Sequence, residues 1–209
     1  MRDPRLWLVS LFVFAAAMAA HADNPLDCSK KSLAEAVSDV SGTSRTISFT
    51  GVCAGPIVIA ADGFTLQGVG TAIIDGGGQD GVTTVGAGRV FLVDFEVTNG
   101  ANGVVARNGA HVSLSGVNSH GNSASGLVLQ TASSAVLSGV SLSNNSRMGV
   151  AADDGVSLIA TSSTMTGNLG ADIQLTFGTR ADLRTLTFAT YTCDATVLVR
   201  GNSGIVCPH

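Results

Sequence analysis

Residues 103–125 read GVVARNGAHVSLSGVNSHGNSAS, and residues 126–148 read GLVLQTASSAVLSGVSLSNNSRM. Written one above the other, the two segments place the same kinds of residue at the same positions. The repeat continues in both directions, with units that start at Gly81, Gly103, Gly126, Gly149 and Asp172, in steps of 22, 23, 23 and 23 residues. A period of this size is typical of a solenoid, in which each unit buries its apolar face only against its neighbours.

Apolar columns stay in phase from unit to unit. One column stands directly after the start of each unit: Val82, Val104, Leu127, Val150 and Ile173. Within a unit the apolar residues are two apart, as on strands, and Gly, Asn and Ser separate the sets. Each unit therefore predicts a coil of three short strands and three turns that rises by about 4.8 Å. The predicted fold is an all-β, three-sided parallel β-helix of about five to seven coils, each of about 23 residues.

An asparagine column lies just after the third strand of successive units, at Asn122, Asn145 and Asn168. Asparagine tolerates the left-handed backbone conformation that a sharp turn needs. Stacked asparagine side chains can also hydrogen-bond along the axis of the stack. We interpret the column as structural, because asparagine is an expected turn residue; a ligand-binding stripe is the alternative.

The N-terminal segment has the pattern of a signal peptide. Arg2 and Arg5 precede an apolar run over residues 6–20, and the small residues Ala20 and Ala22 flank His21. This pattern predicts cleavage after Ala22, a secreted or periplasmic protein, and one domain over residues 23–209. The run is short for a transmembrane helix and no basic stop follows it, so no membrane span is expected after removal of the signal.

Both ends of the predicted solenoid carry distinct elements. Ser32 and Glu35 form a capping box that predicts a helix over residues 29–41, which would cover the open end of the core. Irregular first coils follow over residues 46–80, where we expect Phe64, Leu66 and Val69 to point inward, and regular coils over 81–188. A partial coil ends the chain over residues 189–209.

Four cysteines allow three pairings. Pairing by neighbourhood joins Cys28 to Cys53 and Cys193 to Cys207, which places one disulfide at each end of the solenoid. An exported protein meets the oxidising conditions that such bonds need. No pair of these cysteines has the two-residue spacing of a zinc site, so no metal and no cofactor is predicted.

The composition narrows the classes of partner. Only 12% of the residues are charged and the formal net charge is −4. Nucleic acid is therefore a poor candidate partner, because no basic patch is present to neutralise phosphates. The chain has one Trp, which lies in the signal segment, and one Tyr. This scarcity of aromatic rings argues against a strong sugar-stacking site.

One exposed column combines a base, an amide and an acid. It stands four places after the unit starts and contains Arg107, Gln130 and Asp153, with Arg107 and Asp153 about 10 Å apart at the backbone. His111 follows the turn that ends the first of these strands. These four residues form the candidate ligand-binding site. The alternative is a surface that only meets solvent, because Asp154-Gly155 is a turn dipeptide and Asp153 can begin the bend.

The longest departure from the minimal coil is the Gly-rich segment 76–80. Such an excursion can carry function or can simply connect two strands. Nearly every coil after Gly103 has the minimum length, so we expect flat walls without the groove that catalysis needs.

The repeats resemble those of the pectin-lyase-like superfamily of right-handed parallel β-helices. The resemblance covers residues 46–188 and rests on the pattern N-x-x-x-G-[VL] at Asn122–Leu127 and Asn145–Val150, with V-x-L-x-x-V at Val112–Val117. It implies a right-handed coil, as does the chirality of parallel crossovers. Many members of the superfamily act on acidic polysaccharides as lyases, hydrolases, esterases or epimerases.

The catalytic signatures of those enzymes do not carry over to this chain. The sequences NTD, GHG, DFIFG, WxDH, RxPxxR and DPHD are all absent. No catalytic residue is therefore predicted, and fold alone does not license an activity. The expected function is a non-catalytic binding or structural module of the cell envelope, with a polysaccharide or another envelope component as partner. The alternative is a polysaccharide lyase, hydrolase or epimerase that uses Arg107, His111 and Asp153; the oligomeric state is not predicted.

Overall fold

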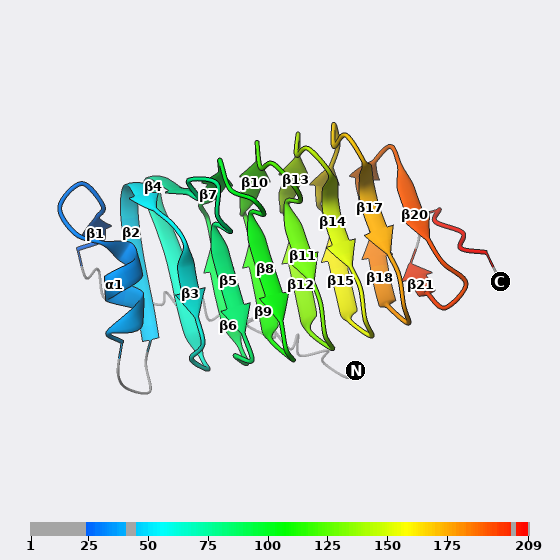
Figure 1. The fold of residues 1–209 in the computed structure, drawn as a ribbon, viewed down its shortest axis with the longest axis horizontal. Helices are drawn as coiled ribbons and strands as arrows, with labels where there is room; N and C mark the ends of the chain where they lie inside the picture. Colours follow the sequence, from blue (N-terminus) through cyan, green and yellow to red (C-terminus); the bar gives the residue numbers. More distant parts are fainter. Residues whose placement is uncertain (1–23, 41–44, 202–203, 209) are drawn as a thin grey trace, which may run out of the picture.

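The structure is a computed structural model that describes residues 24–40, 45–201 and 204–208. In these residues the chain winds as a parallel β-helix with three faces (Figure 1). The predicted signal peptide, residues 1–22, lies outside the described part of the chain.

Face 1 is a seven-stranded parallel sheet in the order β20-β17-β14-β11-β8-β5-β3. Its strands occur once per coil, so neighbours in the sheet are separated in sequence by one turn of the solenoid. The bounds are β3 (Ile57–Ile59), β5 (Val82–Val85), β8 (Val104–Arg107), β11 (Leu127–Leu129), β14 (Met148–Ala152), β17 (Ala171–Leu175) and β20 (Tyr191–Cys193).

Faces 2 and 3 join into one sheet at the N-terminal end, because β2 (Arg45–Ala54) and β4 (Phe64–Asp75) run through the corner without a break. Face 2 continues with β6 (Val90–Val93), β9 (His111–Ser115), β12 (Ser134–Ser138), β15 (Ser157–Thr161), β18 (Arg180–Arg184) and β21 (Leu198–Gly201). Face 3 continues with β7 (Glu96–Thr98), β10 (Asn118–His120), β13 (Ser141–Ser143), β16 (Thr164–Met165) and β19 (Thr187–Phe188).

The register confirms the repeat. Val104 pairs with Leu127, Leu127 with Val150, and Val150 with Ile173, so this column lies in line along the axis. All four side chains are fully buried. Burial of an aliphatic side chain contributes about 1.5–3 kcal/mol, so these stacked columns are the main stabilising element of the solenoid.

One inward position was predicted wrongly. Val69 is 41% exposed, and Gly68 takes the inward place after Phe64 and Leu66. A Cβ atom on Gly68 would meet Cβ of Ala72 at 2.8 Å and Cβ of Phe95 at 2.9 Å. The glycine is thus needed where β4 turns the corner beside Phe95, whose ring lies edge-on to that of Phe49 at 5.4 Å.

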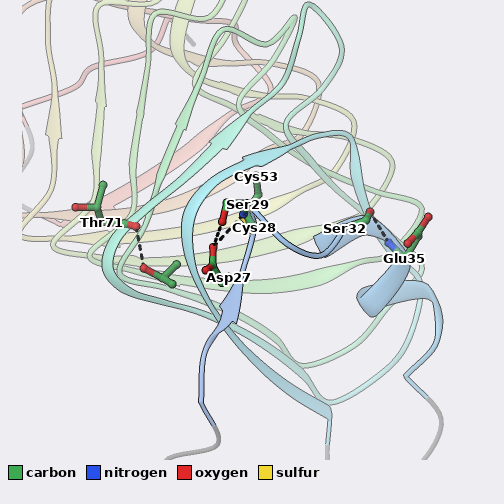
Figure 2. Close-up of a disulfide and its surroundings, with 8 residues drawn as sticks. Asp27, Cys28, Ser29, Ser32, Glu35, Cys53 and Thr71 are labelled. Atoms are coloured by element: carbon green, nitrogen blue, oxygen red, sulfur yellow. Dashed lines mark hydrogen bonds between the residues drawn. A yellow bond between two sulfur atoms is a disulfide. The ribbon is translucent and has the colours of Figure 1, made fainter.

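Helix α1 (Leu33–Ser38) covers the N-terminal end of the core, where Leu33 and Val37 are buried (Figures 1 and 2). The backbone N–H of Glu35 donates to Oγ of Ser32 at 3.2 Å, as the capping box predicts. The helix is shorter than the expected range 29–41, because Cys28 to Lys30 form a turn, Ser32 is the N-cap and Asp39 is the C-cap.

A disulfide closes each end of the solenoid, as predicted. Cys28 is bonded to Cys53 with a Cα–Cα distance of 5.0 Å, beside α1 (Figure 2). Cys193 is bonded to Cys207 with a Cα–Cα distance of 5.5 Å. The second bond holds the tail against the last coil, where Ile205 and Cys207 are buried.

Candidate functional site

Face 1 brings three of the four candidate residues to one edge. Arg107 ends β8, and Gln130 and Asp153 follow β11 and β14 at the same height. The backbone N–H of Gln130 donates to O of Ala106 at 3.0 Å, and that of Asp153 donates to O of Leu129 at 3.0 Å. These bonds continue the ladder of the sheet, so the three side chains stand on successive coils about 4.8 Å apart. We call this row the distal rim of face 1.

Thr176 extends the distal rim by one coil. Its backbone N–H donates to O of Ala152 at 2.9 Å, and its Oγ1 donates to Oδ1 of Asp153 at 3.0 Å. Asp153 is half-buried, whereas Arg107 and Gln130 are exposed. Among the described residues, the guanidinium of Arg107 and the amide of Gln130 have no side-chain partner. The rim therefore presents one cationic donor, one amide and one carboxylate that keeps a free oxygen.

His111 does not join this edge. The residue begins β9 on face 2, after the corner formed by Asn108 to Ala110, and its Nδ1 is hydrogen-bonded to Oγ of Ser134. Asn108 and Gly109 adopt the left-handed conformation, with φ of 58° and 75°, and turn the chain sharply between the two faces. The prediction noted the turn between Arg107 and His111 but did not take it as a change of face.

The opposite edge of face 1 carries polar residues that sequence reasoning missed. Asn102, Ser125 and Arg147 lie in the corner turns that precede β8, β11 and β14. Oδ1 of Asn102 accepts the backbone N–H of Ser125 at 3.1 Å, which aligns the two residues along the axis. We call this row the proximal rim. Asn102 and Ser125 directly precede the Gly that starts the next unit, and Arg147 lies two places before Gly149. The columns compared in the sequence ended at the asparagine column and did not include these last positions of each unit.

Between the rims, face 1 is hollowed. The floor consists of outward residues in the middle of the strands, in register from coil to coil: Val128, Ala151 and Gln174. A depression of about 280 Å³ lies over this floor and is bordered by residues of both rims. Face 1 therefore departs from the expected flat wall by this shallow depression, which lies where the outward side chains are short.

The Gly-rich excursion is part of the corner stack. The backbone N–H of Gly78 donates to O of Asn99 at 2.8 Å, and that of Ala101 donates to O of Gln79 at 2.8 Å. Oδ1 of Asp80 accepts from the backbone and side-chain N–H groups of Asn102 at 3.2 and 2.9 Å. The segment thus lies at the proximal rim, on the side of face 1 opposite Arg107.

The asparagine column is a buried ladder, as its structural interpretation predicts. Nδ2 of Asn122 donates to Oδ1 of Asn145 at 2.9 Å, and Nδ2 of Asn145 donates to Oδ1 of Asn168 at 3.1 Å. The backbone expectation was wrong, because the left-handed residues in these three corners are Gly121, Asn144 and Gly167, each one place before the ladder asparagine. The column points into the solenoid and leaves no stripe for a ligand.

Two further kinds of feature, metal sites and membrane-spanning helices, were sought in the part of the chain that the structure describes. It contains no cluster of three or more His, Cys, Asp or Glu side chains that could hold a metal ion. It also contains no helix with the length and apolar character of a membrane span.

The comparisons with known proteins agree with the architecture. A family model described as a right-handed β-helix region matches residues 60–206, which include both rims of face 1. No curated protein and no solved structure matches the chain. A right-handed β-helix supports a carbohydrate-related or a structural role in general, and the choice between them depends on the surface residues.

Proposed function

The chain belongs to the right-handed β-helix family, and on this premise we propose that it is a non-catalytic binding module for a polysaccharide of the cell envelope. The groove of face 1 is the proposed binding surface. We further propose that the protein is exported. Disulfides at both ends fit an oxidising compartment, and a helical membrane span is absent from the described residues.

The observation that carries the proposal is the axial register of the two rims. Arg107, Gln130 and Asp153 repeat on one side at the spacing of the coils, and Asn102 and Ser125 do so on the other. Between them the floor is formed by the aliphatic side chains of Val128 and Ala151, followed by the amide of Gln174. An extended polymer with hydroxyl groups at its edges and C–H groups on its flat faces complements such a surface, because polar edges meet amides and apolar faces meet aliphatic groups.

Binding is favoured over the alternative of a lyase, hydrolase or epimerase. A proton-transfer reaction needs its acid and base within hydrogen-bond reach of one reacting group. His111 is bonded to Ser134 on another face, and Asp153 accepts a hydrogen bond from Thr176. The residues of the distal rim can thus hold a polymer, and they provide no convergent acid–base pair.

Affinity electrophoresis of the purified protein in gels that contain polygalacturonate, alginate or neutral glucan tests the proposal. We expect retardation by at least one polymer, and a loss of retardation when Gln130 and Asp153 are both changed to Ala. Glu96→Gln on face 3 is the matched control, because Glu96 lies outside the groove.

Product analysis separates binding from catalysis. Incubation with the retarding polymer is expected to leave the number of reducing ends and of unsaturated uronate ends unchanged. Release of such ends by the native protein, with loss of that release in Asp153→Ala, would establish the enzyme alternative instead. Equal mobility of the native protein in all gels would remove the binding proposal.

A further inference from the structure

The outer edge of β21 is a free sheet edge at the C-terminal end of face 2. Among the described residues, β21 pairs with β18 on one side and with no strand on the other. The backbone N–H of Leu198 donates to O of Thr179 at 3.0 Å, so Leu198 bonds toward the stack. Because successive residues of an inner strand bond to alternate neighbours, the N–H and C=O of Val199 point away from β18. Val199 therefore offers one donor and one acceptor to a further strand.

The described part of the C-terminal tail is attached to a different strand. Cys207 is bonded to Cys193 of β20, and the backbone N–H of Val206 donates to Oη of Tyr191 at 3.4 Å. Residues 204–208 do not extend the sheet as a strand. These residues are therefore held at the end of face 1, and they leave the edge of β21 on face 2 unpaired.

Positive charge surrounds this edge. Arg180 and Arg184 on β18 and Arg200 on β21 are all exposed. Nε and Nη2 of Arg184 donate to Oδ1 and Oδ2 of Asp182 at 2.8 and 2.7 Å, so this carboxylate is already held by a two-pronged ion pair. Among the described residues, the side chain of Arg200 has no hydrogen-bond or ion-pair partner. The three guanidinium groups and the one carboxylate together carry a net charge of +2.

The side chains of β21 set the pattern that a partner strand has to match. Leu198 is 46% exposed and Arg200 is exposed, so both point outward. Val199 lies between them, half-buried and in register with the buried Ala181. Side chains directly opposite each other on neighbouring strands interact, and opposite charges do so favourably. A strand that extends the sheet would therefore place an apolar residue beside Leu198 and an acidic residue beside Arg200.

A second copy of this chain fits the edge poorly. Pairing of β21 with its own copy would bring two clusters of net charge +2 together, and like charges on neighbouring strands are destabilising. The C-terminal end of one copy also cannot continue onto the N-terminal end of another. There β1 (Leu26–Asp27) pairs with the outer edge of β2, and α1 covers the core. The edge therefore favours a different partner, one that carries negative charge.

We propose that β21 is a docking edge for an extended acidic segment of a partner protein, which joins the sheet of face 2 as an added strand. Val199 supplies the backbone hydrogen bonds, Leu198 an apolar contact, and Arg200 the charge that selects an acidic residue. A hollow of about 480 Å³ beside the edge is bordered by Leu198, Arg180 and Arg200, and it gives the acidic side chain room between the two guanidinium groups. The site does not involve the groove of face 1 and does not depend on polysaccharide binding there.

Fluorescence anisotropy of a labelled peptide, titrated with the full-length purified protein at low ionic strength, tests the proposal. The probe contains Leu-Val-Glu-Val-Leu, which places its glutamate beside Arg200 and a leucine beside Leu198 in either strand direction. We expect saturable binding, weakened about fivefold or more when lysine replaces the glutamate of the peptide. Arg200→Glu is expected to reverse this preference. Arg89→Glu makes the same change at an exposed residue before β6, far from β21, and should leave the preference unchanged.

Two substitutions at Val199 separate strand pairing from charge attraction. Val199→Pro removes the N–H that points away from β18, and proline is tolerated on an edge strand at such a position. We expect this variant to bind the glutamate peptide about tenfold more weakly or worse, because the backbone bonds to the added strand are lost. Val199→Ala keeps the N–H and should bind nearly as well as the native protein. Equal unfolding temperatures of the two variants would assign the loss to docking, and the charge reversal at Arg200 tests the same edge without a change in the backbone.

The outcomes distinguish an acidic strand from the other occupants of the edge. Absence of saturable binding by the glutamate peptide overturns the proposal. Equal affinities for the glutamate and lysine peptides overturn the role of Arg200, and full binding to Val199→Pro overturns the strand pairing. A dimer of the native protein alone, seen by sedimentation velocity and lost in Val199→Pro, would show that a second copy occupies the edge instead.

Discussion

Nδ2 of Asn168 donates a hydrogen bond to Oδ1 of Asp172 across 2.9 Å, and this contact ends the asparagine ladder. In the two preceding coils the residue four places after the ladder asparagine is Gly126 or Gly149. There the next asparagine along the axis supplies the acceptor. In the coil after Asn168 the corner consists of Ala189 and Thr190, so no asparagine follows in the ladder. Asp172, from the same coil as Asn168, therefore accepts the hydrogen bond of the Asn168 amide.

The ladder predicts a large cost for loss of its central member. Oδ1 of Asn145 accepts the backbone and side-chain N–H groups of Asn122, and its Nδ2 donates to Asn168. Asn145→Ala leaves several buried polar groups unpaired, so we expect a loss of about 3–5 kcal/mol in the free energy of unfolding. Unfolding in guanidinium chloride measures this loss of free energy. Asn118→Ala on the outside of face 3 is the control, expected within about 0.5 kcal/mol of the native protein; equal losses in the two variants would contradict the buried ladder.

Acid should weaken the end of the ladder. Burial by itself raises the pKa of Asp172, but N–H donors from Ala189, Asn168 and Thr190 outweigh it and hold the pKa below 3.8. A carboxyl with a lowered folded pKa contributes stability above its unfolded pKa of about 3.9 and loses that stability as the pH falls through the folded value. Unfolding midpoints measured between neutral pH and acid should therefore fall below about pH 4.

Asp172→Asn supplies the comparison for this pH dependence. Its amide would direct N–H groups at the backbone N–H donors of Ala189 and Thr190, which now bond Oδ2 at 2.8 and 3.1 Å. We expect a loss of about 1–3 kcal/mol at neutral pH. The difference between the variant and the native protein should narrow in acid, and a constant difference at all pH values would argue against this role of Asp172.

The ladder also explains the glycine that starts the regular units. A Cβ atom on Gly149 would meet O of Asp172 at 2.5 Å, Nδ2 of Asn168 at 2.8 Å and O of Leu142 at 2.9 Å, although its backbone is not left-handed. Gly149→Ala should therefore destabilise the protein by about 1–3 kcal/mol through crowding. Gly139 has the opposite character, with a φ of 61° and open space around its Cβ position. Gly139→Ala should cost about 1–2 kcal/mol through its backbone alone.

A second substitution, Asn168→Ala, distinguishes the crowding expected in Gly149→Ala from the backbone strain expected in Gly139→Ala. Asn168→Ala removes one of the three groups that crowd a Cβ atom on Gly149, so the combined cost of Gly149→Ala and Asn168→Ala should be somewhat smaller than the sum of the two single costs. Gly139 lies away from Asn168, and its cost should simply add. Thermal unfolding of the single and double variants measures both relations, and additivity at Gly149 would contradict crowding by the ladder.

The fold could be predicted because the core residues of a solenoid recur at equivalent positions in every coil. Val104, Leu127, Val150 and Ile173 share one environment, so each position in the repeat reports the others. The inward position of Val69 was predicted wrongly because this residue lies in an irregular coil. There Gly68 takes the inward place and leaves room for Phe95. Periodicity gave no warning there, since no second copy of that corner exists to compare.

The candidate site was less predictable, because only those of its residues that recur in successive units could be found from the repeat. Arg107, Gln130 and Asp153 were found because they occupy equivalent places in successive units. His111 stands on a different face, because the left-handed corner at Asn108 and Gly109 decides where face 1 ends. The arginines of face 2 escaped notice because Arg200 belongs to the loosened last coil, and only the register of β21 on β18 places it beside Arg180 and Asp182.

Removal of the C-terminal disulfide should loosen one end of the solenoid and leave its middle intact. Cys193 and Cys207 are 14 residues apart, so the bond contributes about 3 kcal/mol in the chain-entropy model. Each coil contacts mainly its neighbours, so the loss should stay local. In a protein with both residues changed to Ser, amide hydrogen exchange is expected to quicken in β20 and β21 and to stay slow in β11 and β12. The matching variant of Cys28 and Cys53 should quicken exchange at the opposite end; equal loss of protection along the whole stack in either variant would mean that the coils unfold as one unit.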